Sequence, residues 1–235
     1  MTAARGALAA AALVAALGAI SATATAGAKK KTEGAATPTA AGAPVDIDAL
    51  LNQFAKAPGL AARFREEKHL ALLDAPVVNE GRIGFMPPGR FVRHTETPIA
   101  STLLIDGGRL QFGDADGGKQ SMELGTNPVA KLFVDSFVMI LAGDRAGLEK
   151  VFAIKLTPAA PGSPAGSWRL VLTPRVAPMD KVISSITLGG TGLALHDLEV
   201  RESSGDWSRT TFTAVDVNHR YSADEQARVF RLPTR

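Results

Sequence analysis

Histidines and neighbouring carboxylates are the side chains of this sequence that could bind a metal ion or transfer protons. No histidine pair has His-x-His or His-Glu-x-x-His spacing, and each is interpreted as a surface strand residue: His69, His94, His196 and His219. Asp114-Ala115-Asp116 opens like a calcium-binding loop, but Lys119 stands where glycine is needed and Gly125 where a bidentate glutamate is needed. The sequence therefore predicts no metal site.

Paired carboxylates occur as Glu66-Glu67 and as Asp197 with Glu199. The second pair is expected on the exposed face of a strand, and both pairs are interpreted as structural charges rather than as an acid and a base. The glycine-rich segment 162–166 lacks the strand-to-helix turn of a nucleophile elbow, and segment 189–192 lacks the helix and lysine of a phosphate-binding loop. We therefore expect no enzymatic activity and no cofactor.

Charge and cysteine content narrow the class further. The formal net charge is only +3, so no nucleic-acid partner is expected. The sequence has no cysteine, so disulfides and thiolate metal sites cannot stabilise it and an apolar core must do so. We expect a monomer.

Residues 1–44 are predicted to precede the folded domain. Arg5 and the apolar run that follows it are typical of a cleaved secretory signal peptide over residues 1–26. This run is Ala-rich and shorter than the roughly 20 apolar residues that span a bilayer, which disfavours a membrane anchor. Residues 27–44 are mainly Ala, Gly, Thr and Pro and predict a flexible linker. One folded domain is expected over residues 45–235.

Alternating apolar residues dominate that domain and predict antiparallel strands joined by turns such as Pro87-Pro88-Gly89 and Asp106-Gly107-Gly108. In chain order, the residues expected to share strand faces are Leu60, Ala62 and Phe64; Ile83 and Phe85; Ile99, Leu103 and Ile105; Leu110 and Phe112; Phe152, Ile154 and Leu156; Trp168, Leu170 and Leu172; Val182, Ile186 and Leu188; Leu198 and Val200; and a last strand over 212–217.

Helical spacing occurs in three places. Asp46 or Asp48 can cap a helix that contains Leu50, Leu51 and Phe54. A longer helix is predicted over 128–142, with Asn127 as its cap and Gly143 at its end, and a short one over 144–150. Because neither a sheet nor a helix can bury its apolar side alone, these helices are predicted to cover an apolar face of the sheet.

A series of short motifs runs through both halves of the domain. The first half contains Gly81-Arg-Ile-Gly-Phe85, Pro88-Gly89-Arg90-Phe91 and Ile105-Asp106-Gly107, and the second half contains Trp168-Arg-Leu-Val-Leu-Thr-Pro174, Leu198-Glu-Val-Arg-Glu202, Gly205-Asp206-Trp-Ser-Arg-Thr-Thr-Phe212 and Phe230-Arg-Leu-Pro233. In order and spacing they resemble the LolA family of outer-membrane lipoprotein carriers. The resemblance implies an α+β, mainly β fold: an incomplete antiparallel β-barrel, or curved sheet, whose concave apolar face is covered by helices.

The resemblance also implies a function. Members of that family are periplasmic chaperones that shield the acyl chains of lipoproteins in transit from an inner-membrane exporter to an outer-membrane acceptor. By this likeness, the acyl chain would contact the apolar sheet face and a helical lid, through Phe64, Ile83, Phe85, Phe91, Leu103, Leu110, Phe112, Leu132, Phe133, Phe137, Ile140, Leu141, Trp168, Leu170, Leu172 and Ile186.

One departure from the family pattern concerns the lid. The family commonly has an arginine before the phenylalanine strand that holds the lid shut, whereas Pro87 stands at that position here and has no side-chain donor. Arg90 or Arg93 is a candidate replacement for this latch.

Two alternatives to a lipoprotein carrier stay open. A carrier of a non-protein acyl or aryl-polyene lipid is favoured by the missing arginine. A static envelope-interaction module without a ligand would use Phe133, Phe137 and Ile140 as ordinary core, which is the reading that periodicity alone favours.

Overall fold

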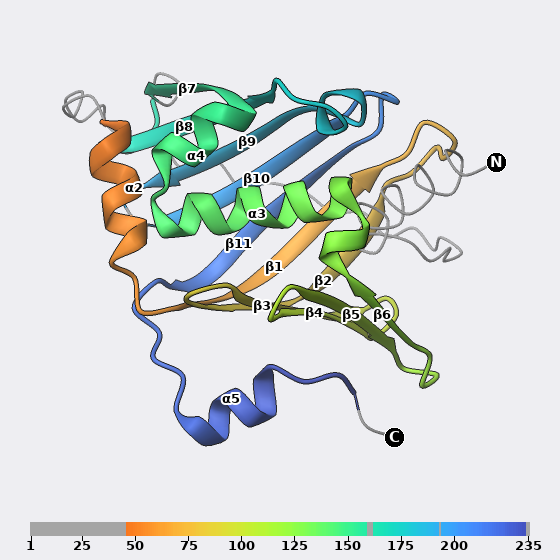
Figure 1. The fold of residues 1–235 in the computed structure, drawn as a ribbon. Helices are drawn as coiled ribbons and strands as arrows, with labels where there is room; N and C mark the ends of the chain where they lie inside the picture. The colour runs from red at the N-terminus through yellow and green to blue at the C-terminus, as the bar shows by residue number, and fades with distance from the viewer. Residues whose placement is uncertain (1–45, 159–161, 193, 234–235) are drawn as a thin grey trace.

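The computed structural model describes residues 46–158, 162–192 and 194–233. The predicted signal peptide and linker lie outside the described residues. Within them, the chain forms one antiparallel sheet of eleven strands together with four α-helices (Figure 1).

The strands lie side by side in the order β6-β5-β4-β3-β2-β1-β11-β10-β9-β8-β7. Because β1 pairs with β11, the two ends of the domain meet in the middle of the sheet, and β6 and β7 form its edges. The strand bounds are β1 Leu60–His69, β2 Val77–Met86, β3 Arg90–Thr97, β4 Ser101–Asp106, β5 Arg109–Asp114, β6 Lys119–Glu123, β7 Phe152–Pro158, β8 Ser167–Pro174, β9 Ile183–Thr191, β10 Ala194–Glu202 and β11 Trp207–Asp216.

Three helices follow the predicted starts and stops: α2 (Ile47–Ala55), α3 (Pro128–Ala142) and α4 (Arg145–Val151). The Asp46 carboxylate accepts a hydrogen bond from the Ala49 amide, and the Asn127 side chain accepts one from Ala130 at 3.0 Å. Gly143 ends α3 in the left-handed conformation, with φ of 69°, which glycine adopts without strain. The predicted cap and stop residues of α3 are therefore confirmed.

These three helices lie over the concave face of the curved sheet (Figure 1). The predicted fold class, an unclosed antiparallel barrel with helices on its apolar inner face, is confirmed. Two short 3-10 helices, η1 (Leu124–Thr126) and η2 (Met179–Lys181), complete the connections on this side.

Some strand boundaries differ from the predicted ones. β11 begins at Trp207 rather than at residue 212, and Ile99 lies in the turn before β4. Val182 precedes β9, and Ile183 packs in the core instead. The register between β9 and β10 shifts next to Ile183. This irregularity changes which residues face the core at the start of β9.

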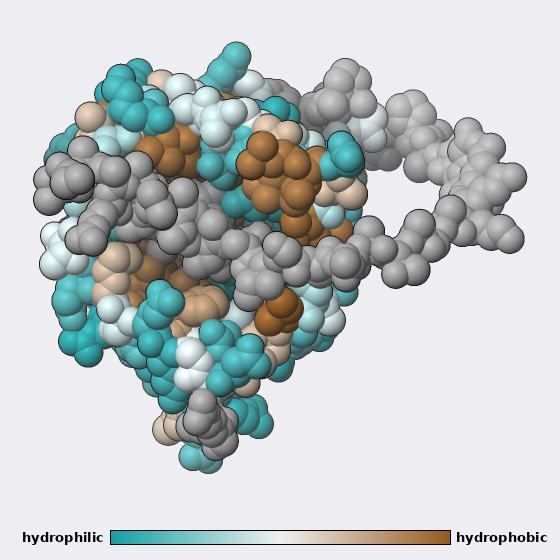
Figure 2. Space-filling model, turned by 90° about the vertical axis from the view of Figure 1, so that its right-hand side faces the viewer, coloured by the Kyte–Doolittle hydropathy of each residue, from teal (hydrophilic) through white to brown (hydrophobic). Residues whose placement is uncertain are grey.

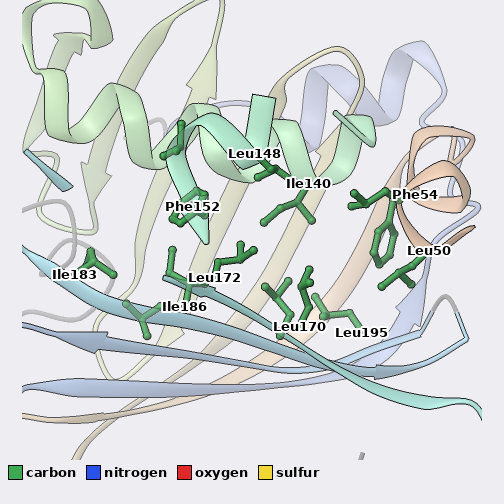
Figure 3. Close-up of a cluster of buried hydrophobic side chains, with 14 of the residues drawn as sticks. Leu50, Phe54, Ile140, Leu148, Phe152, Leu170, Leu172, Ile183, Ile186 and Leu195 are labelled. Carbon is green, nitrogen blue, oxygen red and sulfur yellow. The ribbon is translucent and has the colours of Figure 1, made fainter. Parts of the chain in front are cut away.

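The concave face beneath α2 and α4 is filled by a continuous apolar core. Figure 3 shows Leu170 and Ile186 of the sheet, together with Phe54 of α2, among its side chains. Trp168 also belongs to this core and donates its indole N–H to the Gly192 carbonyl at 2.8 Å. This half of the molecule has the close packing that stabilises an ordinary domain.

The convex face carries a fourth helix that the sequence analysis did not predict, α5 (Ala223–Val229). Phe230, just after it, packs against Val92 and Leu104, which point away from the concave side. The Tyr221 hydroxyl donates to the Leu60 carbonyl at 2.8 Å. The C-terminal segment is thus a second layer on the outer surface of β1 to β4.

The histidines do not all match their prediction as surface strand residues. His94 is half-buried, with its ring nitrogens 2.9 Å from the Thr102 hydroxyl and 2.8 Å from the Val229 carbonyl. His219 lies after β11 and connects Asp216 with Glu225 of α5. Both rings help to hold α5 against the sheet.

Hydrophobic side chains reach the surface in separate patches on the side shown in Figure 2. Leu72 and Leu73, in the loop between β1 and β2, are 96% and 50% exposed. Of the helices in the described ranges, none has the length and apolar character that a membrane crossing requires.

Candidate functional site

An apolar cavity of about 100 Å³ lies between α3 and the concave face of the sheet. Its floor is formed by Phe64, Ile83, Phe91 and Leu103, which come from four adjacent strands, β1 to β4. The strand register places these residues on one face, because Ile83 pairs with Arg93 and Phe91 with Ile105, both of which also line the cavity. A side wall comes from Leu198, Val200 and Phe212 of β10 and β11.

Helix α3 forms the roof of the cavity and is called the lid below. Phe133 and Phe137 are one helical turn apart, as are Val134 and Val138, so the four make one stripe facing the sheet. The Phe137 ring meets the Phe91 ring edge-to-face, with 5.2 Å between centroids. This aromatic contact joins the lid to the floor.

The turn between β2 and β3 reaches the underside of the lid. Gly89 lines the cavity, and a Cβ atom added at Gly89 would lie 3.7 Å from Cγ2 of Val138. A side chain there would make a contact of ordinary van der Waals length, so the turn lies close to the lid without interlocking with it.

One end of the cavity is polar. Glu66 and Arg93 line it and are 3% and 4% exposed, and the Arg93 Nη2 lies 2.7 Å from Glu66 Oε2. Asn79 donates to the same carboxylate at 3.1 Å, and the Arg93 guanidinium stacks over the Phe64 ring at 4.1 Å. A buried ion pair with this many partners is charge-balanced and rigid.

Two hydroxyl side chains from β11 complete this end. Ser208 and Thr210 line the cavity, and Thr210 pairs with Glu66 across the strands. We call Glu66, Arg93, Ser208 and Thr210 the polar end of the cavity.

Of the predicted acyl-contacting residues, the structure brings six to this cavity: Phe64, Ile83, Phe91, Leu103, Phe133 and Phe137. The others lie elsewhere. Trp168, Leu170, Leu172, Ile186 and Ile140 belong to the filled core, with Leu132 packed against it. Phe85 and Leu141 pack together beside β1, Leu110 packs below the start of the lid, and Phe112 is half-buried on β5.

The two candidate latch arginines both make contacts within the sheet. Arg90 Nε lies 2.9 Å from Asp106 Oδ2 of β4, and Arg93 pairs with Glu66 of β1. Pro87, at the position of the family's arginine, lies in the β2–β3 turn, where the Pro87-Pro88 bond is cis. The part of the lid next to this turn is apolar, with Val138 near Gly89.

Sequence reasoning missed the polar end and part of the walls. Glu66 was interpreted as a structural charge, and Ser208, Thr210, Leu198 and Val200 were not proposed as site residues. The signal was present in β1, because the alternation that places Phe64 inward also places Glu66 inward. The expected exposure of Glu199 was wrong: it is 7% exposed, because Arg201 and Arg209 cover it with ion pairs of 2.7 and 2.5 Å.

Comparison with known proteins gives one family. The family described as "Outer membrane lipoprotein carrier protein LolA-like" matches residues 35–231. No curated protein sequence matches the chain.

Solved structures similar to this chain include a LolA superfamily protein from Nitrosomonas europaea, at 9% identity and a TM-score of 0.39 over 77% of this chain and 97% of that one. The MucA/MucB complex of Pseudomonas aeruginosa is similar at 13% identity and a TM-score of 0.45, over 77% of this chain and 60% of that one. LprF from Mycobacterium bovis is similar at 13% identity and a TM-score of 0.38, over 72% and 90%.

Proposed function

The chain belongs to the LolA-like family of outer-membrane lipoprotein carrier proteins, and on that premise we propose that it is a periplasmic carrier that shields the acyl chains of lipoproteins in transit to the outer membrane. The observation that supports this most directly is the apolar cavity between the sheet and the lid. An ordinary core would fill that space with side chains, as it does under α2 and α4.

The size of the cavity implies that the lid moves. An engineered apolar cavity of roughly 150 Å³ holds one benzene molecule, so a cavity of about 100 Å³ is too small for a long acyl chain. Cargo must therefore displace the side chains of Phe133 and Phe137. Separation of the lid from the floor would open the space along the strands.

Displacement of the lid also explains how cargo could be released. Burial of a 16-carbon acyl chain would contribute on the order of 12 kcal/mol before costs. A carrier with that full affinity would not hand its cargo on. In the empty state, Phe133 and Phe137 occupy part of the space between the lid and the sheet. Cargo therefore competes with these two side chains, and the net affinity for cargo falls.

A periplasmic location, an inner-membrane exporter as donor and an outer-membrane acceptor belong to the same proposal. The family membership supports them, and so does the signal-like sequence of residues 1–26. The proposal is non-enzymatic, because the chemistry that the cavity offers is burial of hydrocarbon.

A second candidate is a carrier of a non-protein acyl or aryl-polyene lipid. Pro87 favours it, because the arginine common to the lipoprotein carriers is absent at that position. Mass spectrometry of lipids that co-purify with the protein from its periplasm would separate the two. Triacylated peptides support the first candidate, and a free lipid supports the second.

A charged residue in the lid tests the proposal. We expect Phe137→Asp to reduce binding of a fluorescent fatty acid at least tenfold, because the aspartate carboxylate would lie in the apolar cavity. The side chain is half-buried, so the circular dichroism spectrum should stay that of the folded protein. Leu72→Asp, which adds the same charge at an exposed apolar residue, is the control and should bind normally.

Two results would count against a carrier. One is fatty-acid binding by Phe137→Asp at wild-type affinity. The other is unfolding of this variant combined with no uptake by the wild type, which would make Phe137 simple core of a static module.

A further inference from the structure

The concave face of β1 changes from apolar to charged along the strand. Leu60, Ala62 and Phe64 point into the apolar part, and Glu66 and Lys68 continue the same alternation. All five are buried. The cavity is therefore apolar over most of its lining and polar at one end. A plain hydrocarbon chain would need only the apolar part.

The charges at this end cancel. Glu66 pairs with Arg93 at 2.7 Å, and further along β1, outside the residues that line the cavity, Lys68 lies 3.7 Å from Glu202. An anionic group arriving in the cavity would meet one cation, Arg93, which already has a carboxylate partner. It would lose its own hydration without gaining a free counter-charge, so the polar end disfavours a carboxylate or a phosphate.

A buried ion pair is weak evidence for stability. Burying two charges costs desolvation, and apolar residues of similar volume often serve as well or better. A pair kept between apolar neighbours at the wall of a cavity is a candidate for recognition.

Hydrogen-bonding capacity remains at this end. A carboxylate offers about four acceptor positions, and at Glu66 these receive the Arg93 guanidinium and the Asn79 amide. The Thr210 side chain is 6% exposed and lines the cavity, so its hydroxyl lies within reach of a group that enters there. A hydroxyl oxygen has two acceptor positions and can receive a hydrogen bond from a donor on the ligand.

We propose that the polar end of the cavity binds the head of the cargo, and that this head is neutral and donates a hydrogen bond, as an amide N–H or a hydroxyl attached to the acyl chain does. This inference rests on the proposed carrier function and adds the class of head group to it. In the bound state, the hydrocarbon lies along Phe64, Phe91 and Leu103, and the head reaches Thr210 and the carboxylate of Glu66.

Three probes with the same hydrocarbon chain test the head group: N-methyldodecanamide, methyl dodecanoate and dodecanoate. The first is neutral with a donor, the second is neutral without one, and the third is an anion. Competition against a fluorescent acyl probe on the protein purified from the periplasm should rank the amide about tenfold above the ester, since a hydrogen bond to a charged group contributes that much. The carboxylate should be the weakest.

Thr210→Val removes the hydroxyl with little change in shape. We expect it to weaken amide binding several-fold and to leave ester binding unchanged. Thr211→Val, on the adjacent exposed residue of the same strand, is the matched control and should leave all three probes unaffected.

The outcomes separate the two proposals. Equal binding of the three probes by the wild type overturns the head-group inference and leaves the carrier function standing. An equal effect of Thr210→Val on amide and ester also overturns it. Failure of every probe to bind the wild type overturns the carrier function and, with it, the inference.

Discussion

Glu66 and Arg93 place two opposite charges, each at least 96% buried, next to the apolar floor of a cavity. The alternation from Phe64 indicates that Glu66 faces inward, but not that this face is covered, because β1 beyond Phe64 is polar on both faces, with Arg65 and Glu67 outside and Glu66 and Lys68 inside. Periodicity identifies which residues share a face. It does not identify which face is covered when both are charged.

The buried pair makes a prediction about stability. Arg93→Met should lower the free energy of unfolding by about 3–5 kcal/mol, because it leaves the Glu66 carboxylate buried without its counter-charge. The double variant Glu66→Leu/Arg93→Met should recover much of that loss. Urea unfolding followed by circular dichroism measures both. A double variant less stable than Arg93→Met would contradict this description of the pair.

At the scale of elements, the lid was the most predictable part of the molecule. Asn127, Pro128 and Gly143 define its ends locally, so its bounds follow from the sequence. Its role was less predictable, because the apolar residues of α3 face two environments. Phe133 and Phe137 line the cavity, whereas Ile140 packs in the filled core.

Helix α5 is held by two histidines whose pKa values move in opposite directions. Burial lowers the pKa of His94 below 6.5, and this outweighs its hydrogen bond to the Val229 carbonyl. Burial also acts to lower the pKa of His219, but hydrogen bonds to Glu225 and Asp216 outweigh it and raise that pKa above 6.5. Neutral His94 and protonated His219 are therefore the forms that the folded state favours.

These two pKa shifts predict that the combined contribution of His94 and His219 to the free energy of unfolding is greatest close to pH 6.5. The stabilisation linked to His94 is present above its unfolded pKa of 6.5 and is lost as the pH falls towards its lower folded pKa. That of His219 is complete below 6.5 and is lost as the pH rises through its raised folded pKa. Hydrogen exchange of the α5 amides at about pH 5, 6.5 and 8 measures both.

Substitution of each histidine separates the two contributions. His94→Gln should flatten the acid side of the exchange profile, and His219→Gln the alkaline side. Identical profiles for the two variants would show that these rings do not control how α5 is held.

At the scale of the whole molecule, the concave face is divided between two roles. Under α2 and α4 it is filled, and under the first part of the lid it encloses a cavity. The resemblance drawn from the sequence predicted the curved sheet and its helical cover, but the proposed acyl contacts included residues from both parts of the apolar face. Trp168 and Leu170 have the same alternation as Phe64 and Ile83, and only the position of α2 and α4 above them distinguishes core from cavity.

In the proposed function, hydrocarbon enters the cavity when the lid separates from the sheet. The chain has no cysteine, so a single engineered disulfide can tie the two together. Gly89 and Val138 are the pair to test, because a Cβ atom at Gly89 would lie 3.7 Å from Cγ2 of Val138, which puts the two positions in side-chain contact across the turn and the lid.

The most direct test is therefore acyl-probe binding by Gly89→Cys/Val138→Cys, measured oxidised and again after reduction. We predict that the oxidised protein binds a fluorescent fatty acid at least tenfold more weakly than the reduced protein, with each single-cysteine variant unaffected by reductant. Equal binding in both states, with the disulfide verified by mass spectrometry, would contradict a movable lid.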